Sequence, residues 1–467
     1  MITVRGCVVA SLVLLVIALQ TAHAAAQPNI VFFLVDDQRN TTLGVSGDSF
    51  ARTPTIDKLA RDGVRFTNAF VTTSICAASR ASILTSLTER THGYTFGAPP
   101  VSSDHIQASY PTQLKTAGYQ TAFFGKFGIK IEDEGQIEHM FDAHSFRDRP
   151  YLRKSNSSKV RHIDELNTAE AIAFIDSTTN DKPFCLSVFF SSGHAEDSDK
   201  VNHYPSIPAV EGMFDDVRFP APRLGAASVF DSQPEFLKNS MNRERFFWRW
   251  DTQEKYQKNM RGYYRLISGV DVMIRRALDA LDQQGITENT VIIYAADNGY
   301  YMGDRGFAGK WSHYEESLRI PMIVYDPRQP DANRGRVSDE MVLNIDIGAT
   351  ILDLAAVDQP NHYQGSSLKP FMNGDVPPDW RTDFFVEHRM QHPKIPTWEG
   401  VRSERYVYAR YDGQSPPYEF LQDLAVDPDQ LKNFAGESEY ESILSYMRTR
   451  CDALRANYVD ARKTRSP

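Results

Sequence analysis

The chain has 467 residues, of which 60 are acidic and 51 are basic, and its formal net charge is −9. This acidic balance argues against a nucleic-acid-binding protein, so an anionic ligand would need a local cluster of cationic side chains. The length exceeds the roughly 250–300 residues at which one hydrophobic core stops growing, so we expect a large core and a smaller second unit.

The N-terminus has the pattern of a secretory signal peptide. Arg5 precedes an apolar run from Cys7 to Leu19, and Ala22-His23-Ala24 follows this run. That order is typical of a signal peptide with a cleavage site. We therefore predict a cleaved signal peptide over residues 1–24 and a secreted or periplasmic protein. No later stretch approaches the roughly 20 apolar residues of a membrane span.

The predicted cleavage leaves three cysteines, Cys76, Cys185 and Cys451. An odd number of scattered cysteines in an exported protein is not typical of a disulfide scaffold and leaves at least one thiol for another use. Cys185 lies in an apolar run and Cys451 in a helical pattern. Cys76 has polar surroundings and is the candidate for chemistry.

Four apolar runs without alternation predict strands that are buried on both faces of a parallel sheet. Each run ends in polar residues. The four are Ile30–Val35 before Asp36-Asp37, Thr121–Phe124 before Gly125-Lys126, Phe184–Phe190 before the turn with His194, and Val291–Ala296 before Asp297-Asn298. Helical patterns separate them, so the class is α/β, in which ligands bind beyond the carboxyl ends of the strands.

The clearest helical pattern has Thr53 as its N-cap, Pro54 at its first position and Gly63 at its end. The segment from Glu196 to Trp250 has little periodicity, and we expect it to be a long surface excursion near the site. Further helices are predicted over Tyr110–Ala117, His162–Ser177 and Glu254–Gln283.

Three carboxylates and an amide at the strand ends predict a metal site. Carboxylates that lie close together cannot all stay ionised unless a cation neutralises them. Asp36, Asp37, Asp297 and Asn298 offer only oxygen ligands, which favours calcium or magnesium over zinc. One Asp-Asp pair after a strand is more often a helix cap or a turn. Two pairs with oxygen ligands, Asp36-Asp37 and Asp297-Asn298, each at the end of a buried strand, favour the metal.

Cys76 begins the run Cys76-Ala77-Ala78-Ser79-Arg80, which continues into a helical pattern. A nucleophile at a helix N-terminus lies at the positive end of the helix dipole, and Arg80 lies one turn further on. Tyrosine-phosphatase chemistry requires an arginine six residues after the cysteine, where this chain has Ser82. The surroundings also differ from those of a papain-type cysteine.

The run from Cys76 to Arg80 resembles the signature of type I sulfatases, cysteine-x-proline/alanine-x-arginine, whose cysteine a formylglycine-generating enzyme oxidises. The order of the other segments is also similar to that family. These segments are Asp36-Asp37, Gly125-Lys126, the His194 turn, Asp297-Asn298-Gly299, Gly309-Lys310-Trp311 and Glu399–Tyr406.

This resemblance implies an alkaline-phosphatase-like fold, with a large mixed, mostly parallel sheet between helices. It implies a catalytic domain over residues 27–355. Residues 370–460 would form a C-terminal subdomain with a four-stranded antiparallel sheet and a terminal helix.

The resemblance also implies a sulfuric ester hydrolase and a role for each site residue. Cys76, converted to an aldehyde hydrate, would attack sulfur, with Asp297 as the base. Lys126 and Lys310 would neutralise sulfate oxygens and His194 would protonate the leaving alcohol, while Arg80 belongs to the same catalytic set. The second hydroxyl of the hydrate would then expel sulfate. One calcium ion would be held by Asp36, Asp37, Asp297, Asn298 and an oxygen of the modified Cys76.

One position departs from the family pattern. Many sulfatases have a histidine two residues after the lysine that corresponds to Lys126, and this chain has Gly128 there. That histidine helps the sulfated intermediate to collapse, so the base of the second step stays unassigned. His313 and His92 are the candidates to replace it, and a surface position for His313 is an equal alternative.

Exported relatives in this family commonly act on glycans, so we expect a sulfated polysaccharide or glycosaminoglycan as the substrate. The segments Phe246–Trp250 and Glu387–Arg389 are candidates for a sugar subsite, although the aromatic residues are equally suited to packing. An aryl or alkyl sulfatase, a phosphoester or phosphonate-ester hydrolase of the same fold, and an inactive carbohydrate-binding relative are the alternatives. A single metal site favours sulfate over phosphate.

Overall fold

The computed structural model describes residues 27–154, 160–179 and 181–460. The predicted signal peptide lies outside these residues and stays a prediction. Within the described ranges, no helix is both long enough and apolar enough to cross a membrane.

An eight-stranded sheet forms the centre of the fold, with the strand order β10-β2-β9-β8-β1-β7-β3-β4. Strand β9 is antiparallel to both of its neighbours, and all other neighbouring pairs are parallel. This mixed, mostly parallel sheet confirms the predicted class. The strands are β1 (Asn29–Val35), β2 (Val64–Phe70), β3 (Gln120–Gly125), β4 (Ala143–Phe146), β7 (Phe184–Phe190), β8 (Thr290–Ala296), β9 (Arg319–Tyr325) and β10 (Arg336–Leu343).

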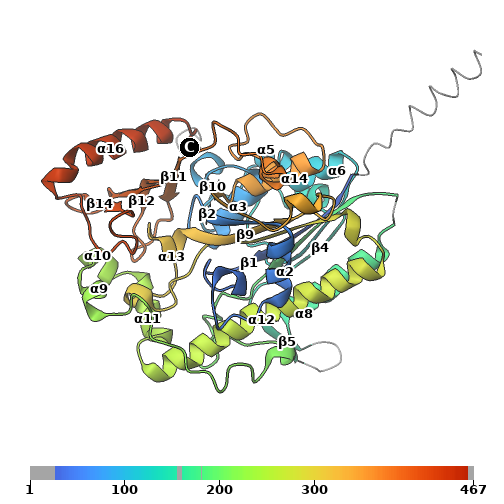
Figure 1. Cartoon of the computed structure of the whole chain (residues 1–467), viewed down its shortest axis with the longest axis horizontal. Coiled ribbons are helices and arrows are strands. Elements are labelled where there is room, and N and C mark those ends of the chain that lie inside the picture. Colours follow the sequence, from blue (N-terminus) through green and yellow to red (C-terminus); the bar gives the residue numbers. More distant parts are fainter. Residues whose placement is uncertain (1–26, 155–159, 180, 461–467) are drawn as a thin grey trace, which may run out of the picture.

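Helices cover both faces of this sheet (Figure 1). Successive residues of β1 point to opposite faces, so that Phe32 lies in one core cluster and Phe33 in the other. Because both faces are buried, β1 has no polar alternation. One layer contains α3 (Cys76–Thr85), α5 (Ser103–Gln107), α6 (Tyr110–Thr116) and α14 (Asp346–Leu354), and the other contains α2 (Pro54–Asp62), α8 (Ile163–Ser177) and α12 (Gln253–Gln283).

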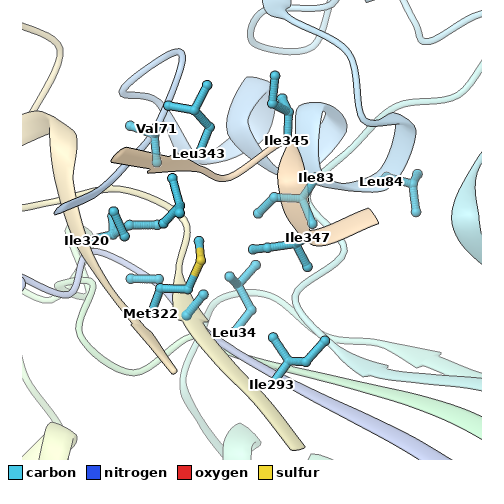
Figure 2. Packing of buried hydrophobic residues seen from close by; sticks show 14 of the residues in the cluster. Leu34, Val71, Ile83, Leu84, Ile293, Ile320, Met322, Leu343, Ile345 and Ile347 are labelled. Carbon is cyan, nitrogen blue, oxygen red and sulfur yellow. The ribbon is translucent and has the colours of Figure 1, made fainter. Parts of the chain in front are cut away.

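The packing of the first layer holds α3 against the sheet. In Figure 2, Leu34 from β1 points toward Ile347 of α14, and Ile83 of α3 lies beside Ile347. All three side chains are fully buried. Every residue of α3 is buried, so the helix that begins at Cys76 is fixed along its whole length.

The helices predicted from the sequence are all present, with ends that differ by at most one residue. Thr53 occupies the N-cap position of α2, but its hydroxyl hydrogen-bonds to Asp57 at 3.1 Å instead of capping the helix. Asp271 of α12 accepts from the backbone N–H of Ile56 at 2.8 Å. The cap of α2 therefore comes from a neighbouring helix.

Further short elements are α4 (Glu89–His92), α7 (Ile137–Met140), α13 (Glu315–Leu318), α15 (Lys369–Asn373), and the paired strands β5 (Leu152–Lys154) and β6 (Val160–His162).

A separate four-stranded antiparallel sheet follows, with α16 (Glu441–Ala456) over one of its faces (Figure 1). Cys451 of α16 is buried in that contact, and Cys185 is buried in β7. The opposite face joins the main core through Trp398 and Phe420. The domain bounds predicted above stay a prediction. The strands are β11 (Asp383–His388), β12 (Trp398–Ser403), β13 (Tyr406–Tyr411) and β14 (Tyr418–Asp423).

The segment from Glu196 to Trp250 has more helical structure and more buried residues than the long surface excursion near the site that we expected. It contains α9 (Ala227–Asp231), α10 (Glu235–Lys238) and α11 (Met241–Arg249). Phe214 and Phe219 are buried and pack on Tyr264 of α12. These helices are too short for their apolar periodicity to show in the sequence.

Candidate active site

The four strands with polar residues at their carboxyl ends are neighbours in the sheet, in the order β8-β1-β7-β3. All of these neighbours are parallel, so their carboxyl ends meet at one edge. This arrangement brings together residues that are far apart in the sequence. They are Asp36, Asp37, Lys126, His194, Asp297 and Asn298.

Two lysines lie among the carboxylates. Lys126 Nζ contacts Asp36 Oδ2, and Lys310 Nζ contacts Asp37 Oδ1. Lys310 Nζ also lies 4.0 Å from Asp36 Oδ1. Burial alone would raise the pKa of Asp36, but the opposing charge of Lys126, with smaller contributions from three other cationic groups, holds it well below its usual range.

Arg80 joins the helix that begins at Cys76 to the ends of β8 and β3. Its Nε donates to Asp297 Oδ2 at 2.8 Å, and its Nη1 donates to the carbonyl oxygen of Lys126. Its Nη2 lies 3.7 Å from Asp36 Oδ2. The guanidinium is fully buried, so it fixes the position of Cys76 relative to the carboxylates.

Asp37 is held in an uncommon backbone conformation. Its φ is 52°, in the left-handed region that few residues other than glycine adopt. The backbone N–H of Asp37 donates to Asp297 Oδ1 at 3.1 Å, and the hydroxyl of Tyr263 donates to its carbonyl oxygen at 3.0 Å. These bonds offset the strain and aim the carboxylate at the site.

The acidic side chains fit a hard cation. Ligand oxygens of Asp36, Asp37 and Asp297 lie within 4.8 Å of one another. Asp36 Oδ1 and Asn298 Oδ1 are buried and receive no hydrogen bond from the described protein atoms. Burial and the charge of Asp36 raise the pKa of Asp297 to about 7. A cation among these oxygens would restore the ionised form of Asp297 and satisfy both buried oxygens.

Cys76 is the first residue of α3, and its exposed fraction is 7%. Ile75 precedes it at the N-cap and has no polar side-chain atom to accept from the first turn. The N–H groups of that turn and the positive end of the helix dipole therefore favour negative charge beside Cys76.

His194 lies in the turn after β7. Its Nδ1 lies 2.6 Å from the carbonyl oxygen of Ala195, which makes Nδ1 the protonated nitrogen of the neutral ring. Its Nε2 lies 3.9 Å from Asp37 Oδ2. Burial holds the pKa of His194 well below its usual value, and Lys126 is the largest of the positive charges that add to this effect. The turn packs tightly, because a Cβ on Gly193 would lie 2.0 Å from the carbonyl oxygen of Asp36.

A cavity of about 730 Å³ opens above these groups. The predicted residues that line it are Cys76, Arg80, Lys126, His194 and Lys310. Other residues in its wall are Lys130, Asp148, Arg149, Asp197, Arg245 and Trp311. Of these, Trp311 belongs to a motif named above, and Asp197 and Arg245 lie in the segment from Glu196 to Trp250 that we expected near the site, with Arg245 just before the aromatic residues Phe246–Trp250. No residue from Phe246 to Trp250 lines the cavity.

The other candidate segment for a sugar subsite lies elsewhere. Glu387, His388 and Arg389, expected near a sugar subsite, line a separate cavity of about 180 Å³ beside Arg90. Glu387 is almost fully buried and forms an ion pair with Arg90 at 2.7 Å. These residues therefore join β11 to α4 rather than contact the main cavity.

Neither candidate for the missing second-step base lines the main cavity. The ring of His313 is buried between Tyr314 and Phe420, and its Nδ1 lies 2.9 Å from the hydroxyl of Tyr411. It is thus neither a surface residue nor a site residue. His92 lies 3.0 Å from the hydroxyl of Ser82.

Gly128, where the family has a histidine, lines the cavity with a φ of 68°. A Cβ at this position would meet Arg80 Cδ at 3.5 Å, an ordinary contact. Space for a side chain is therefore present, and the left-handed backbone is what favours glycine here.

Two family models match the chain. The model described as "Sulfatase" matches residues 28–357, and the model described as "N-sulphoglucosamine sulphohydrolase, C-terminal" matches residues 303–457. The first covers well over half of the chain. These matches confirm the resemblance that the cysteine signature carries.

Two curated relatives extend over most of the chain. The N-acetylglucosamine-6-O-sulfatase of Bacteroides thetaiotaomicron is 27% identical over 89% of this chain and 84% of its own length. The human N-acetylglucosamine-6-sulfatase is 25% identical over 88% of this chain and 82% of its own length.

Solved structures agree with these matches. The structure of BT4656 in complex with its substrate D-glucosamine-2-N,6-O-disulfate aligns with a TM-score of 0.80 and 25% identity, over 93% of this chain and 99% of that one. The phosphonate monoester hydrolase of Silicibacter pomeroyi aligns with a TM-score of 0.79 and 22% identity, over 93% of this chain and 96% of that one, which shows a shared fold. The chain belongs to the sulfatase family and is a sulfuric ester hydrolase.

Proposed function

We propose that this enzyme removes sulfate from a sulfated carbohydrate, with Cys76 converted to formylglycine and one calcium ion in the site. The observation that carries the proposal is the position of Cys76 at the start of α3, in the wall of a cavity that it shares with two lysines and a histidine. Relatives that act on sulfated glucosamine support the substrate class.

Asp36, Asp37, Asp297 and Asn298 would hold the ion, together with an oxygen of modified residue 76. Calcium, when bound, would act as a Lewis acid that polarises an oxygen of the sulfate group. The unbonded oxygens of Asp36 and Asn298 support these ligands, because each is buried without another partner among the described residues.

The remaining side chains have roles that follow from where they lie. Lys126 and Lys310 would neutralise the other sulfate oxygens. Asp297, which accepts from Arg80, would take the proton of the attacking hydroxyl of residue 76. His194 would give the leaving oxygen a proton from Nε2, which needs the doubly protonated ring, a form that the negative charge of a bound sulfate group would favour.

The formylglycine hydrate would supply two hydroxyl groups, one to form the new O–S bond as the S–O bond to the sugar breaks, and one to expel sulfate as the aldehyde forms again. A serine or cysteine at position 76 has no second hydroxyl for this release. Residue 128 contributes no side chain, so the proton acceptor of the release step stays unassigned.

Phosphonate or phosphate monoester hydrolysis is the second candidate, since the multifunctional alkaline phosphatase superfamily protein PehA of Trinickia caryophylli is 24% identical over 92% of this chain. Among the described residues, Asp36, Asp37 and Asp297 form the one group of three acidic, histidine or cysteine side chains arranged closely enough for a metal. A single ion with nearby lysines favours the sulfate ester over reactions that use two metal ions.

We propose that the protein is secreted or periplasmic. We also propose a formylglycine-generating enzyme as its maturation partner, which would modify Cys76 before or during secretion. The N-terminal pattern from Arg5 to Ala24 supports this location.

Purified enzyme, co-expressed with a formylglycine-generating enzyme, should release sulfate from 6-O-sulfated glucosamine derivatives faster than it releases phosphate from 4-nitrophenyl phosphate. The Cys76→Ala variant is the control for contaminating activity. Hydrolysis of 4-nitrophenyl phosphate with the higher kcat/KM would place the phosphoesterase candidate first. Activity on 4-nitrophenyl sulfate but on no sulfated sugar would limit the proposal to an aryl sulfatase.

A further inference from the structure

The outer wall of the cavity contains a carboxylate that is surrounded by arginines. Asp197 Oδ2 lies 3.0 Å from Arg245 Nη2 and 3.7 Å from Arg149 Nη1. Asp197 Oδ1 contacts the guanidinium of Arg249, which is fully buried behind the wall. One carboxylate therefore pairs with three cationic side chains, and among the described residues Arg149 alone of the three forms a second ion pair, with Asp148 at 3.7 Å.

This outer charge differs from the charge near Cys76. In the inner part of the cavity, the cationic groups of Arg80, Lys126 and Lys310 each contact one of the three metal-site carboxylates. Outside the metal site, three cationic residues line the cavity, Lys130, Arg149 and Arg245, against two carboxylates, Asp148 and Asp197. Asp197 is also shared with Arg249 behind the wall. This additional positive charge belongs to cavity residues that are not among the groups that would hold the reacting sulfate, so it is available to another part of the substrate.

Arg245 is the best placed of these residues to contact a ligand. Its guanidinium lies over the indole of Trp311, 4.8 Å from the ring centroid, which orients the plane of its donors. Its Nε is buried and has no hydrogen-bond partner among the described protein atoms. Trp311 follows Lys310 directly, so Arg245 lies close to the reaction centre.

We propose that Arg245 and Arg149, joined by Asp197, form a subsite for a second anionic group, a sulfate or a carboxylate, on the sugar that leaves. This proposal rests on the proposed function, because it needs a carbohydrate leaving group. A planar guanidinium binds either anion through two parallel N–H bonds, and Asp197 keeps both arginines in place without neutralising them.

The test compares three sulfated sugars with converted enzyme. The first is N-acetylglucosamine-6-O-sulfate, which has no second anion; the second is glucosamine carrying both N-sulfate and 6-O-sulfate; the third is N-acetylglucosamine-6-O-sulfate linked to a uronic acid. We expect the wild type to prefer the second or the third, and the preferred one identifies the anion as sulfate or carboxylate. In Arg245→Gln, the ratio of kcat/KM for the preferred dianion to that for the monoanion should fall roughly 10- to 100-fold, mainly through KM.

Two further variants make the result specific. Arg149→Gln removes a side chain that is 36% exposed and should lower the same ratio without endangering the fold. Lys255→Gln removes a positive charge from the exposed side of α12, where Lys255 pairs with Asp251, and should leave the ratio unchanged. Calorimetric binding of the three sugars to Cys76→Ala gives the same comparison without turnover, and affinity for the preferred dianion should fall when Arg245→Gln is added.

Each outcome decides the proposal. An equal loss for monoanion and dianion would assign Arg245 to the reacting sulfate, and an unchanged ratio in both arginine variants would remove the subsite. A wild type without any preference for a second anion would also overturn it. Failure of the proposed function is a different result, in which wild-type enzyme turns over 4-nitrophenyl sulfate and none of the three sugars.

Discussion

The indole N–H of Trp398 donates to the carbonyl oxygen of Trp311 at 2.8 Å. Trp398 begins β12 of the C-terminal sheet, and Trp311 follows the predicted catalytic Lys310. Trp311 has a φ of 78°, a strained value for a bulky residue, and Asn242 donates to the carbonyl oxygen of Lys310 at 2.6 Å. The C-terminal sheet therefore helps to hold the lysine over the carboxylates.

Replacing Trp398 by Phe should lower kcat about 3- to 10-fold and leave KM within about twofold, because the loss of one hydrogen bond costs about 0.5–1.5 kcal/mol. Trp380→Phe is the matched control, since its indole N–H donates to the carbonyl oxygen of Met341 at 2.8 Å, away from the cavity. Both variants should lose similar stability in thermal unfolding. An equal fall of kcat in both would show that the bond to Trp311 has no special part in placing Lys310.

Lys126→Ala and Lys310→Ala should each lower kcat about 10²–10³-fold, the scale for loss of a preorganised charge on a transition state. Both substitutions should also lower stability. Each lysine contacts a fully buried carboxylate, and removal of one partner leaves the other charge uncompensated.

We therefore expect the melting temperature of both lysine variants to fall in metal-free protein and to recover partly with calcium. Lys58→Ala, which breaks an exposed pair with Asp62, should change neither activity nor melting temperature measurably. Near-normal turnover in either cavity variant would remove that lysine from the catalytic set.

The meeting of the polar residues at the strand ends could be predicted from the sequence for a physical reason. Strands β1, β3, β7 and β8 are buried on both faces, so each is a continuous apolar run with a clear end. Parallel neighbours place those ends at one edge, and that rule alone brings Asp36 near Asp297. Arg245 and Asp197 follow no such rule, because they meet through a short helix and an irregular segment.

The sequence also does not predict the backbone conformation of two residues in the cavity wall. The left-handed φ of Gly128 and of Trp311 depends on contacts with distant segments, such as the bond from the hydroxyl of Tyr94 to the carbonyl oxygen of Gly128 at 3.2 Å. A glycine in the sequence shows that such a conformation is permitted, whereas a tryptophan gives no sign of it.

Gly128→His should not restore a family-like second-step base. A φ of 68° costs an L-residue roughly 1–2 kcal/mol, although the Cβ itself meets no clash. We expect a lower free energy of unfolding by about that amount and no gain in kcat. Gly128→Ala separates the two effects, since it carries the same backbone cost without an imidazole. A kcat above wild type in the histidine variant alone would contradict this expectation.

Removal of the metal should lower activity and stability together. Ligand oxygens of Asp36, Asp37 and Asp297 lie within 4.8 Å of one another, and Arg80, Lys126 and Lys310 offset their repulsion only in part, since the charge of Asp36 still raises the pKa of Asp297. Binding of an ion only to the folded state stabilises that state by mass action. Chelation should lower the melting temperature and abolish turnover, and calcium should restore both. Asn298→Ala should weaken the response to calcium in the same titration. Full activity after exhaustive chelation would contradict the metal site.

The modification of Cys76 is the prediction on which the proposed mechanism depends. Oxidation of the thiol to an aldehyde lowers the mass of the peptide that ends at Arg80 by about 18 Da, because the CH2–SH group becomes CH=O. Cys185 provides an internal control, since burial in β7 raises its pKa to about 12 and it should stay unmodified.

Cys76→Ser should form a sulfate ester once and then stop, because its single oxygen cannot expel the sulfate, and Cys76→Ala should fold but show no turnover. Mass spectrometry of the active enzyme and of Cys76→Ser after incubation with substrate measures both outcomes. Steady turnover by protein whose Cys76 peptide carries only an unmodified thiol would exclude the aldehyde as nucleophile. Arg80, Lys126 and Lys310 would then have to stabilise a substrate that water or the Cys76 thiolate attacks. Phosphoesters would become the first substrates to test.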